Sequence, residues 1–103
     1  MVQTHARKRI DIFTETAVLS RVEEALTTAG VTGYTVVPCI KGRGWHGEWH
    51  SDEIADSGRM VMVTAILRET SLDTVIASLQ PLLKHWRLVI SIADVSVIRS
   101  EKF

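Results

Sequence analysis

The sequence has little cysteine, no excess of charge of either sign and no long apolar run. Its single cysteine, Cys39, excludes an internal disulfide framework and suits a reducing compartment. Twelve basic residues balance twelve acidic ones, which argues against broad binding to duplex nucleic acid, because neutralising phosphates needs an excess of cations. The apolar runs are too short to span a membrane, and the basic first residues lack the apolar stretch of a signal peptide. We therefore expect a soluble, cytoplasmic protein.

The 103 residues are expected to form a single domain spanning residues 1–103. Residues that alternate with a period of two predict strands at 9–15, 34–40, 59–67 and 87–98. Apolar residues with helical spacing predict helices at 16–30 and 71–86. This order predicts an α+β fold, a ferredoxin-like βαββαβ sandwich with a long loop between the second and third strands. Because that fold serves many functions, the function has to be argued from the site.

Individual residues mark where these elements begin and end. Thr16 and Ser71 are candidate N-caps, and Gly30 stands at the position that follows a helix C-terminus. Pro38 indicates an edge strand or a bulge, since proline lacks a donor for the ladder. Pro81 is expected to end or kink the second helix near its last turn.

The loop at about 41–58 is the most unusual segment. Its first ten residues, KGRGWHGEWH, contain three glycines, two tryptophans and two histidines. Gly42 and Gly44 can turn backbone N–H groups inward around an anion, with the charges of Lys41 and Arg43 beside them, and this pattern favours a phosphate. The alternative is a flexible hairpin tip with solvated charges. Loops of this length are usually functional or disordered.

Metal binding and catalysis find less support in the sequence. His46, Glu48 and His50 alternate, so an extended segment would point them to one side, but the spacing matches no known zinc motif and no fourth ligand is evident. We predict no metal site and keep these three residues as the candidates for one. Cys39 has no obvious base, and patterns of the Ser-His-Asp or P-loop type are absent. The protein is therefore expected not to be an enzyme and to have no cofactor.

The residues that lead into the loop carry a family resemblance. The stretch GVTGYTVVPCIKGRG at 30–44 resembles the PII signalling family, in which a G-x-x-G-[MY]-T-V turn and strand leads into K-G-x-G and a long, mobile T-loop. The βαββαβ order and a V-I-R ending at Arg99 fit the same family, so the resemblance covers most of the chain. Further matches at 14–15, 33–36 and 69–70 resemble the PII-like branch tied to inorganic carbon. That branch includes carboxysome-associated proteins and the regulator paired with a bicarbonate transporter.

This resemblance implies a homotrimer that binds an adenine nucleotide in clefts between its subunits. The residues that it assigns to nucleotide binding are Gly33, Tyr34, Thr35, Lys41, Gly42, Arg43, Gly44, Thr64, Ile66, Leu88, Val89, Ile90 and Arg99. It implies bicarbonate as a second ligand, with Arg43, Trp45 and His46 as candidates for the anion site. It also implies an unidentified protein target, a transporter or a carboxysome-related enzyme.

The sequence departs from the PII pattern at several positions. Trp45 and His46 stand where the family has an Arg-Gln pair that serves Mg²⁺ and 2-oxoglutarate, so sensing of 2-oxoglutarate is not expected. The one tyrosine, Tyr34, lies in the turn, so the family's modification of a loop tyrosine is not expected either. The glycine-rich loop before the last strand is reduced to KHWR at 84–87, and Glu101 replaces a second C-terminal arginine. The shortened loop lacks part of the family's triphosphate clamp, which favours ADP or AMP over ATP.

The two loop tryptophans raise a further expectation. Trp45 and Trp49 would share one face of an extended segment, and we expect that face to fold over the bound nucleotide and to order the loop. Without a ligand, residues 43–57 are expected to be mobile, because they contain few aliphatic side chains. The alternative function is a trimeric, divalent-metal-binding protein of the CutA type, which shares the topology. A third is an interaction module that binds neither ligand.

Overall fold

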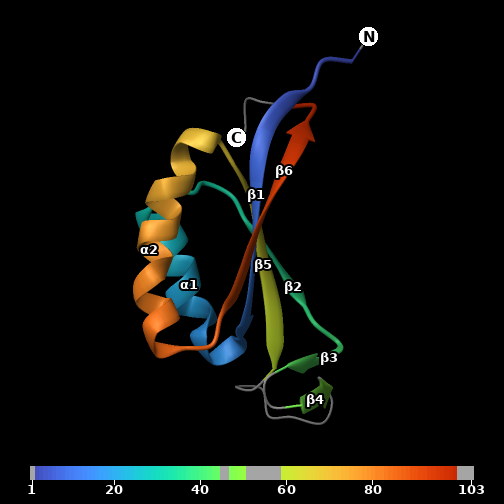
Figure 1. The fold of residues 1–103 in the computed structure, drawn as a ribbon, viewed down its shortest axis with the longest axis vertical. Coiled ribbons are helices and arrows are strands. Elements are labelled where there is room, and N and C mark those ends of the chain that lie inside the picture. Colours follow the sequence, from blue (N-terminus) through green and yellow to red (C-terminus); the bar gives the residue numbers. More distant parts are fainter. Residues whose placement is uncertain (1, 45–46, 51–58, 100–103) are drawn as a thin grey trace.

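The chain folds into two layers, a four-stranded antiparallel sheet and two α-helices that pack on one of its faces (Figure 1). The computed structural model describes residues 2–44, 47–50 and 59–99. Along the chain the elements are β1 (His5–Glu15), α1 (Thr16–Thr28), β2 (Thr35–Pro38), β3 (Lys41–Gly44), β4 (Gly47–His50), β5 (Met60–Leu67), the 3-10 turn η2 (Glu69–Ser71), α2 (Leu72–His85) and β6 (Val89–Val97). Outside the β3–β4 hairpin this order confirms the predicted βαββαβ arrangement. Among the residues described, no helix has the length and apolarity to cross a membrane.

The strand order in the sheet is β2-β5-β1-β6, so β1 is a central strand. It pairs with β5 from Lys8 to Glu15 and with β6 from His5 to Phe13. The strand therefore begins earlier than the predicted residue 9, because pairing with β6, and not apolar alternation, orders residues 5–8. β2 lies at the edge of the sheet, which confirms the expectation from Pro38.

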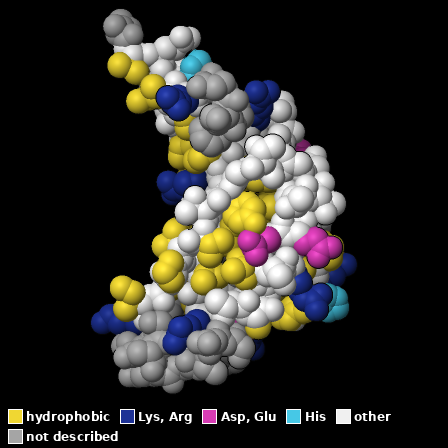
Figure 2. Space-filling view, turned by 180° about the vertical axis from the view of Figure 1, so that it is seen from behind, with side chains coloured by type: hydrophobic (Ala, Val, Ile, Leu, Met, Phe, Trp, Pro, Cys, Tyr) yellow, Lys and Arg dark blue, Asp and Glu magenta, His cyan; other side chains and the backbone are white. Residues whose placement is uncertain are grey.

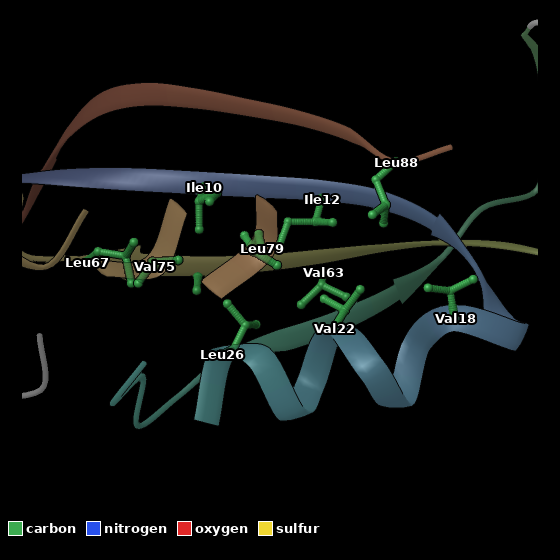
Figure 3. Close-up of a cluster of buried hydrophobic side chains, with 11 residues drawn as sticks. Ile10, Ile12, Val18, Val22, Leu26, Val63, Leu67, Val75, Leu79 and Leu88 are labelled. Carbon is green, nitrogen blue, oxygen red and sulfur yellow. The ribbon is translucent and has the colours of Figure 1, made fainter. Parts of the chain in front are cut away.

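The hydrophobic core lies between the sheet and the two helices (Figure 3). Alternate residues of β1 and β5 face the helices, and helical spacing brings one side of α1 and α2 against them. Burying each of the valine, leucine and isoleucine side chains among them contributes about 1.5–3 kcal/mol. The buried cluster consists of Ile10, Ile12, Val18, Val22, Leu26, Val63, Ala65, Leu67, Val75, Leu79 and Leu88.

The C-terminus of α1 ends as the sequence predicts. Gly30 adopts a φ of +88°, a left-handed conformation that glycine enters without steric cost. Its N–H donates to the carbonyl of Thr27 at 3.0 Å, and the N–H of Val31 donates to the carbonyl of Leu26 at 3.0 Å. These two bonds form a Schellman motif, which satisfies carbonyls that the helix leaves unpaired.

The predicted N-cap of α1 is wrong by one residue, whereas Ser71 takes the N-cap position of α2 as predicted. Thr16 is the first helical residue, and its N–H and hydroxyl approach the carbonyl of Arg59 at 2.8 and 3.3 Å. Glu15 takes the N-cap position of α1 and Ser71 that of α2, but neither forms a side-chain cap bond. Pro81 does not end α2, which continues for a further turn beyond it.

The sequence predicts a long loop at 41–58, but part of this segment forms a hairpin. β3 pairs with β4 in antiparallel register, and the hairpin lies at one end of the sheet (Figure 1). Glycines alternate with longer side chains in β3, a pattern that fits a strand as well as a turn. The rest of this segment, with most of the predicted mobile stretch 43–57, lies outside the described residues, so its mobility stays a prediction.

The face of the sheet opposite the helices, which we call the open face, is covered by no described element (Figure 1). Apolar residues line up on it across all four strands. Two of them are considerably exposed, at 38% and 50% for the β2 and β6 members. Hydrophobic side chains also reach the surface in the middle and along one side of the space-filling view (Figure 2). The apolar row consists of Val37, Met62, Phe13 and Val89.

Candidate functional site

The row of the open face next to the apolar one is polar and consists of Thr35, Thr64, Asp11 and Ser91. Thr35 and Thr64, both nucleotide-binding candidates, are paired across β2 and β5 and therefore lie side by side. The pairing of β2 with β5 extends from Pro38 to Thr35, which lies opposite Thr64. Beyond Thr64, the part of β5 that includes Ile66 therefore has no partner on β2 in the described ladder. Backbone N–H and C=O groups on that edge are free of strand pairing and can bond a flat heterocyclic ligand.

The turn that leads into β2 is held against α1 by Tyr34. The phenol of Tyr34 donates a hydrogen bond to the Glu23 carboxylate, and its ring packs against the core cluster. This bond, together with desolvation, raises the pKa of the Tyr34 phenol above its ordinary value. The Tyr34 hydroxyl is thus bonded within the chain. Gly33 and Tyr34 can offer a ligand the backbone groups of this anchored turn.

The expected anion nest is not formed at the start of the loop. Gly42 and Gly44 lie in β3, opposite Trp49 and Gly47 of β4, so backbone groups of this segment serve the hairpin. Among the described residues, Gly30 is the glycine with a positive φ, and neither Gly42 nor Gly44 shares that conformation. The side chains of Lys41 and Arg43 are exposed on β3, where alternation places them on the same side of the strand. They are therefore positioned to pair with an anion, although the glycine backbone does not enclose it.

The candidates in and near β6 differ in what they offer a ligand. Leu88 is buried in the core at 5% exposure and Ile90 packs against the core, which leaves Val89 as the exposed side chain of the three. Arg99 is exposed beyond the end of β6. Thr35 belongs to β2, at the opposite edge of the sheet from β6. Within one chain, Thr35 and the candidates in and near β6 therefore lie on opposite edges of the sheet and do not form one site.

Asp11 is a polar residue of the open face that the sequence analysis did not select. Its carboxylate accepts a hydrogen bond from the Thr64 hydroxyl at 2.7 Å and one from Arg9 Nε at 3.1 Å, and its side chain is 14% exposed. The Thr64 hydroxyl is therefore occupied within the chain. The alternation at 9–15 could have placed Asp11 on the uncovered face, but only the register with β5 shows its partner.

A catalytic role for Cys39 and a metal site do not gain support from the described residues. Burial raises the pKa of the Cys39 thiol, which makes this cysteine a poorer nucleophile near neutral pH. The part of the chain that the structure describes contains no group of three or more His, Cys, Asp or Glu residues placed to hold a metal. Trp45 and His46 lie outside the described residues, and the structure does not place the side chains of Glu48 and His50. Metal and anion roles for these loop residues stay untested.

Comparison with known proteins gives a family match over nearly the whole chain. The model of the family described as nitrogen regulatory protein P-II matches residues 7–102. No curated protein sequence matches the chain.

Solved structures similar to this chain include PII-like proteins. CPII from Thiomonas intermedia K12, bound to ADP, AMP and bicarbonate, is 25% identical with a TM-score of 0.86, over 96% of this chain and 94% of CPII. The same protein bound to ADP and bicarbonate has a TM-score of 0.83 at 25% identity, over 96% and 95% of the two chains. A PII-like signalling protein from Thermus thermophilus has a TM-score of 0.83 at 22% identity, over 98% of each chain, and supports the fold alone.

Proposed function

Because the chain belongs to the P-II family of nitrogen regulatory proteins, we propose that it is a regulatory protein, not an enzyme, that binds ADP or AMP in clefts between copies of itself. The observation that carries this proposal is the separation of the candidate residues onto two edges of the sheet. Thr35 and the free edge of β5 lie at one side, and Val89 lies at the other. A cleft between two copies can use both edges at once, whereas one chain cannot. The 25% identical CPII, which binds ADP and AMP, supports the choice of ligand.

The assembly that we propose is a homotrimer. The open face exposes an apolar row in which Val37 and Val89 remain considerably accessible, and contacts between copies would remove this surface from water. At about 25 cal/mol per Å² of apolar area, covering the face of every copy contributes several kcal/mol. The same contacts would bring the β2 edge of one copy toward the β6 edge of the next.

Bicarbonate is proposed as a second ligand, held beside the nucleotide phosphates by Arg43 with Trp45 and His46. The support is the CPII complex with ADP and bicarbonate, together with the exposed guanidinium of Arg43 on β3. If bicarbonate binds better to the nucleotide-loaded state, reciprocity requires that it tighten nucleotide binding by the same factor. Ordering of the loop by Trp45 and Trp49 is the proposed coupling. A transporter or a carboxysome-related enzyme stays the predicted protein target.

Replacing Arg43 with alanine is expected to weaken ADP binding. Each charge-assisted hydrogen bond to phosphate is worth about 1.5–3 kcal/mol, so losing one lowers the affinity roughly tenfold or more. Isothermal titration calorimetry measures this directly. Arg21→Ala, which removes an exposed cation from α1 in the helical layer, is the matched control and should leave the affinity unchanged. Equal affinities of the Arg43 and Arg21 variants would show that Arg43 does not contact the phosphates.

A thermal-shift screen distinguishes this function from the alternative of a CutA-type metal-binding protein. A ligand that binds the folded state raises the melting temperature by mass action. We expect ADP or AMP to stabilise the protein. Stabilisation by Cu²⁺, Ni²⁺ or Zn²⁺ alone would favour the metal-binding alternative, and stabilisation by neither class would favour an interaction module.

A further inference from the structure

The open face carries a cation, Arg7, whose hydrogen bonding is incomplete among the described residues. Arg7 lies on β1, two residues from Arg9 and four from Asp11, so alternation places all three on this face. The Arg7 guanidinium donates to the carbonyl of Ala6 at 2.7 Å, but its buried Nε has no partner among the residues that the structure describes. A buried donor without an acceptor costs about 1–3 kcal/mol in the general case, so the Arg7 guanidinium gains from a further acceptor.

The strands beside Arg7 offer no acceptor side chain for it. Its partner across β6 is Val95, and the partner of Arg9 on that strand is Ala93. On the other side, Arg9 faces Ile66 of β5. The acceptor that completes the bonding of Arg7 is therefore not among these neighbours.

Asp11 offers the complementary half of such a contact. Each of its carboxylate oxygens accepts one bond, Oδ1 from Thr64 and Oδ2 from Arg9, and each oxygen has a further lone pair. Arg9 already offsets the negative charge of Asp11, and the hydrogen bond from Thr64 fixes the orientation of the Asp11 carboxylate. The carboxylate is thus preorganised to accept another donor on a face that other copies are proposed to cover.

We propose that Arg7 of one copy pairs with Asp11 of a neighbouring copy across the open face. The two residues lie too far apart along an extended strand to meet within one chain, since a strand rises about 3.3 Å per residue. Between copies, the pairing gives the Arg7 guanidinium an anionic acceptor and Asp11 a further donor. It also fixes how one open face is placed on the next, because a charge pair of this kind discriminates between registers more than an apolar row does. This inference rests on the proposed homo-oligomer.

Chemical cross-linking between two variants tests the pairing. In a Cys39→Ser background, Arg7→Cys and Asp11→Cys chains are mixed, unfolded, refolded together and treated with a short bismaleimide. We expect a cross-linked dimer from the mixture and none from either variant alone. The matched control replaces Arg7→Cys with Lys8→Cys, because Lys8 lies on the opposite face of β1 and pairs with Asp94. That mixture should give no dimer.

The outcomes separate this inference from the oligomer on which it rests. A mixture that is oligomeric by light scattering but gives no cross-link would overturn the pairing, as would a cross-link in the Arg7→Cys sample alone. A protein that stays monomeric by light scattering would overturn the proposed assembly and the pairing with it. As a second readout, Arg7→Gln should raise the concentration of half-dissociation about tenfold or more, because charge pairs buried between proteins are strongly coupled. An unchanged value would contradict the pairing.

Discussion

Replacing Leu79 with alanine is expected to lower the free energy of unfolding by about 2–5 kcal/mol. Leu79 is fully buried in the cluster between α2 and the sheet (Figure 3). The substitution removes apolar atoms from a close-packed site, and the neighbouring side chains of both layers cannot fill the space without moving the helix. The loss is a large fraction of the stability of a domain of this size.

Urea unfolding followed by circular dichroism measures this change. The protein concentration has to be held fixed, because stability of an oligomer depends on it. Leu83→Ala, one turn further along α2 at 44% exposure, is the matched control and should change the stability by less than about 1 kcal/mol. Similar losses for the two variants would contradict the burial of Leu79 in the core.

Replacing Phe13 with glutamate is expected to leave the chain folded and to abolish its self-association. Phe13 stands between Met62 and Val89 in the apolar row of the open face, where a single chain leaves it partly accessible to water. A carboxylate there stays hydrated in the isolated chain, but covering the face removes its water at a cost on the order of several kcal/mol per copy.

Light scattering at micromolar concentration gives the mass of each variant, and circular dichroism reports whether it is folded. Leu83→Glu introduces the same charge on the helical layer and should keep the mass of the unaltered protein. A folded Phe13→Glu variant that keeps the oligomeric mass would show that the open face is not the contact surface.

The sequence predicts the architecture well because each element carries its own periodicity. β5 alternates buried and half-buried residues along its whole length, and α1 buries Val18, Val22 and Leu26 at helical spacing. The first residues of β1 have no such pattern, since they are ordered by pairing with β6. The sequence does not predict the β3–β4 hairpin for a related reason, because glycine favours turns locally, whereas pairing with β4 holds β3 extended.

The candidate site is less accessible to sequence reasoning because it depends on partners far along the chain. Thr35 and Thr64 were selected, and the register sets them side by side. The hydroxyl of Thr64 and the phenol of Tyr34, however, are taken by Asp11 and Glu23, and neither bond follows from local sequence. The sheet order also places Val89 at the edge opposite Thr35, and this separation is the basis for the proposed site between copies.

Calorimetric titration of ADP into the protein, at fixed pH and ionic strength and with and without bicarbonate, tests the central claim most directly. The proposed function predicts saturable heat from ADP binding and a tighter dissociation constant when bicarbonate is present. An affinity for ADP that bicarbonate leaves unchanged would contradict the coupling between the two ligands. The absence of binding heat with ADP and with AMP, in either buffer and over a range of temperatures, would contradict the nucleotide-binding function itself.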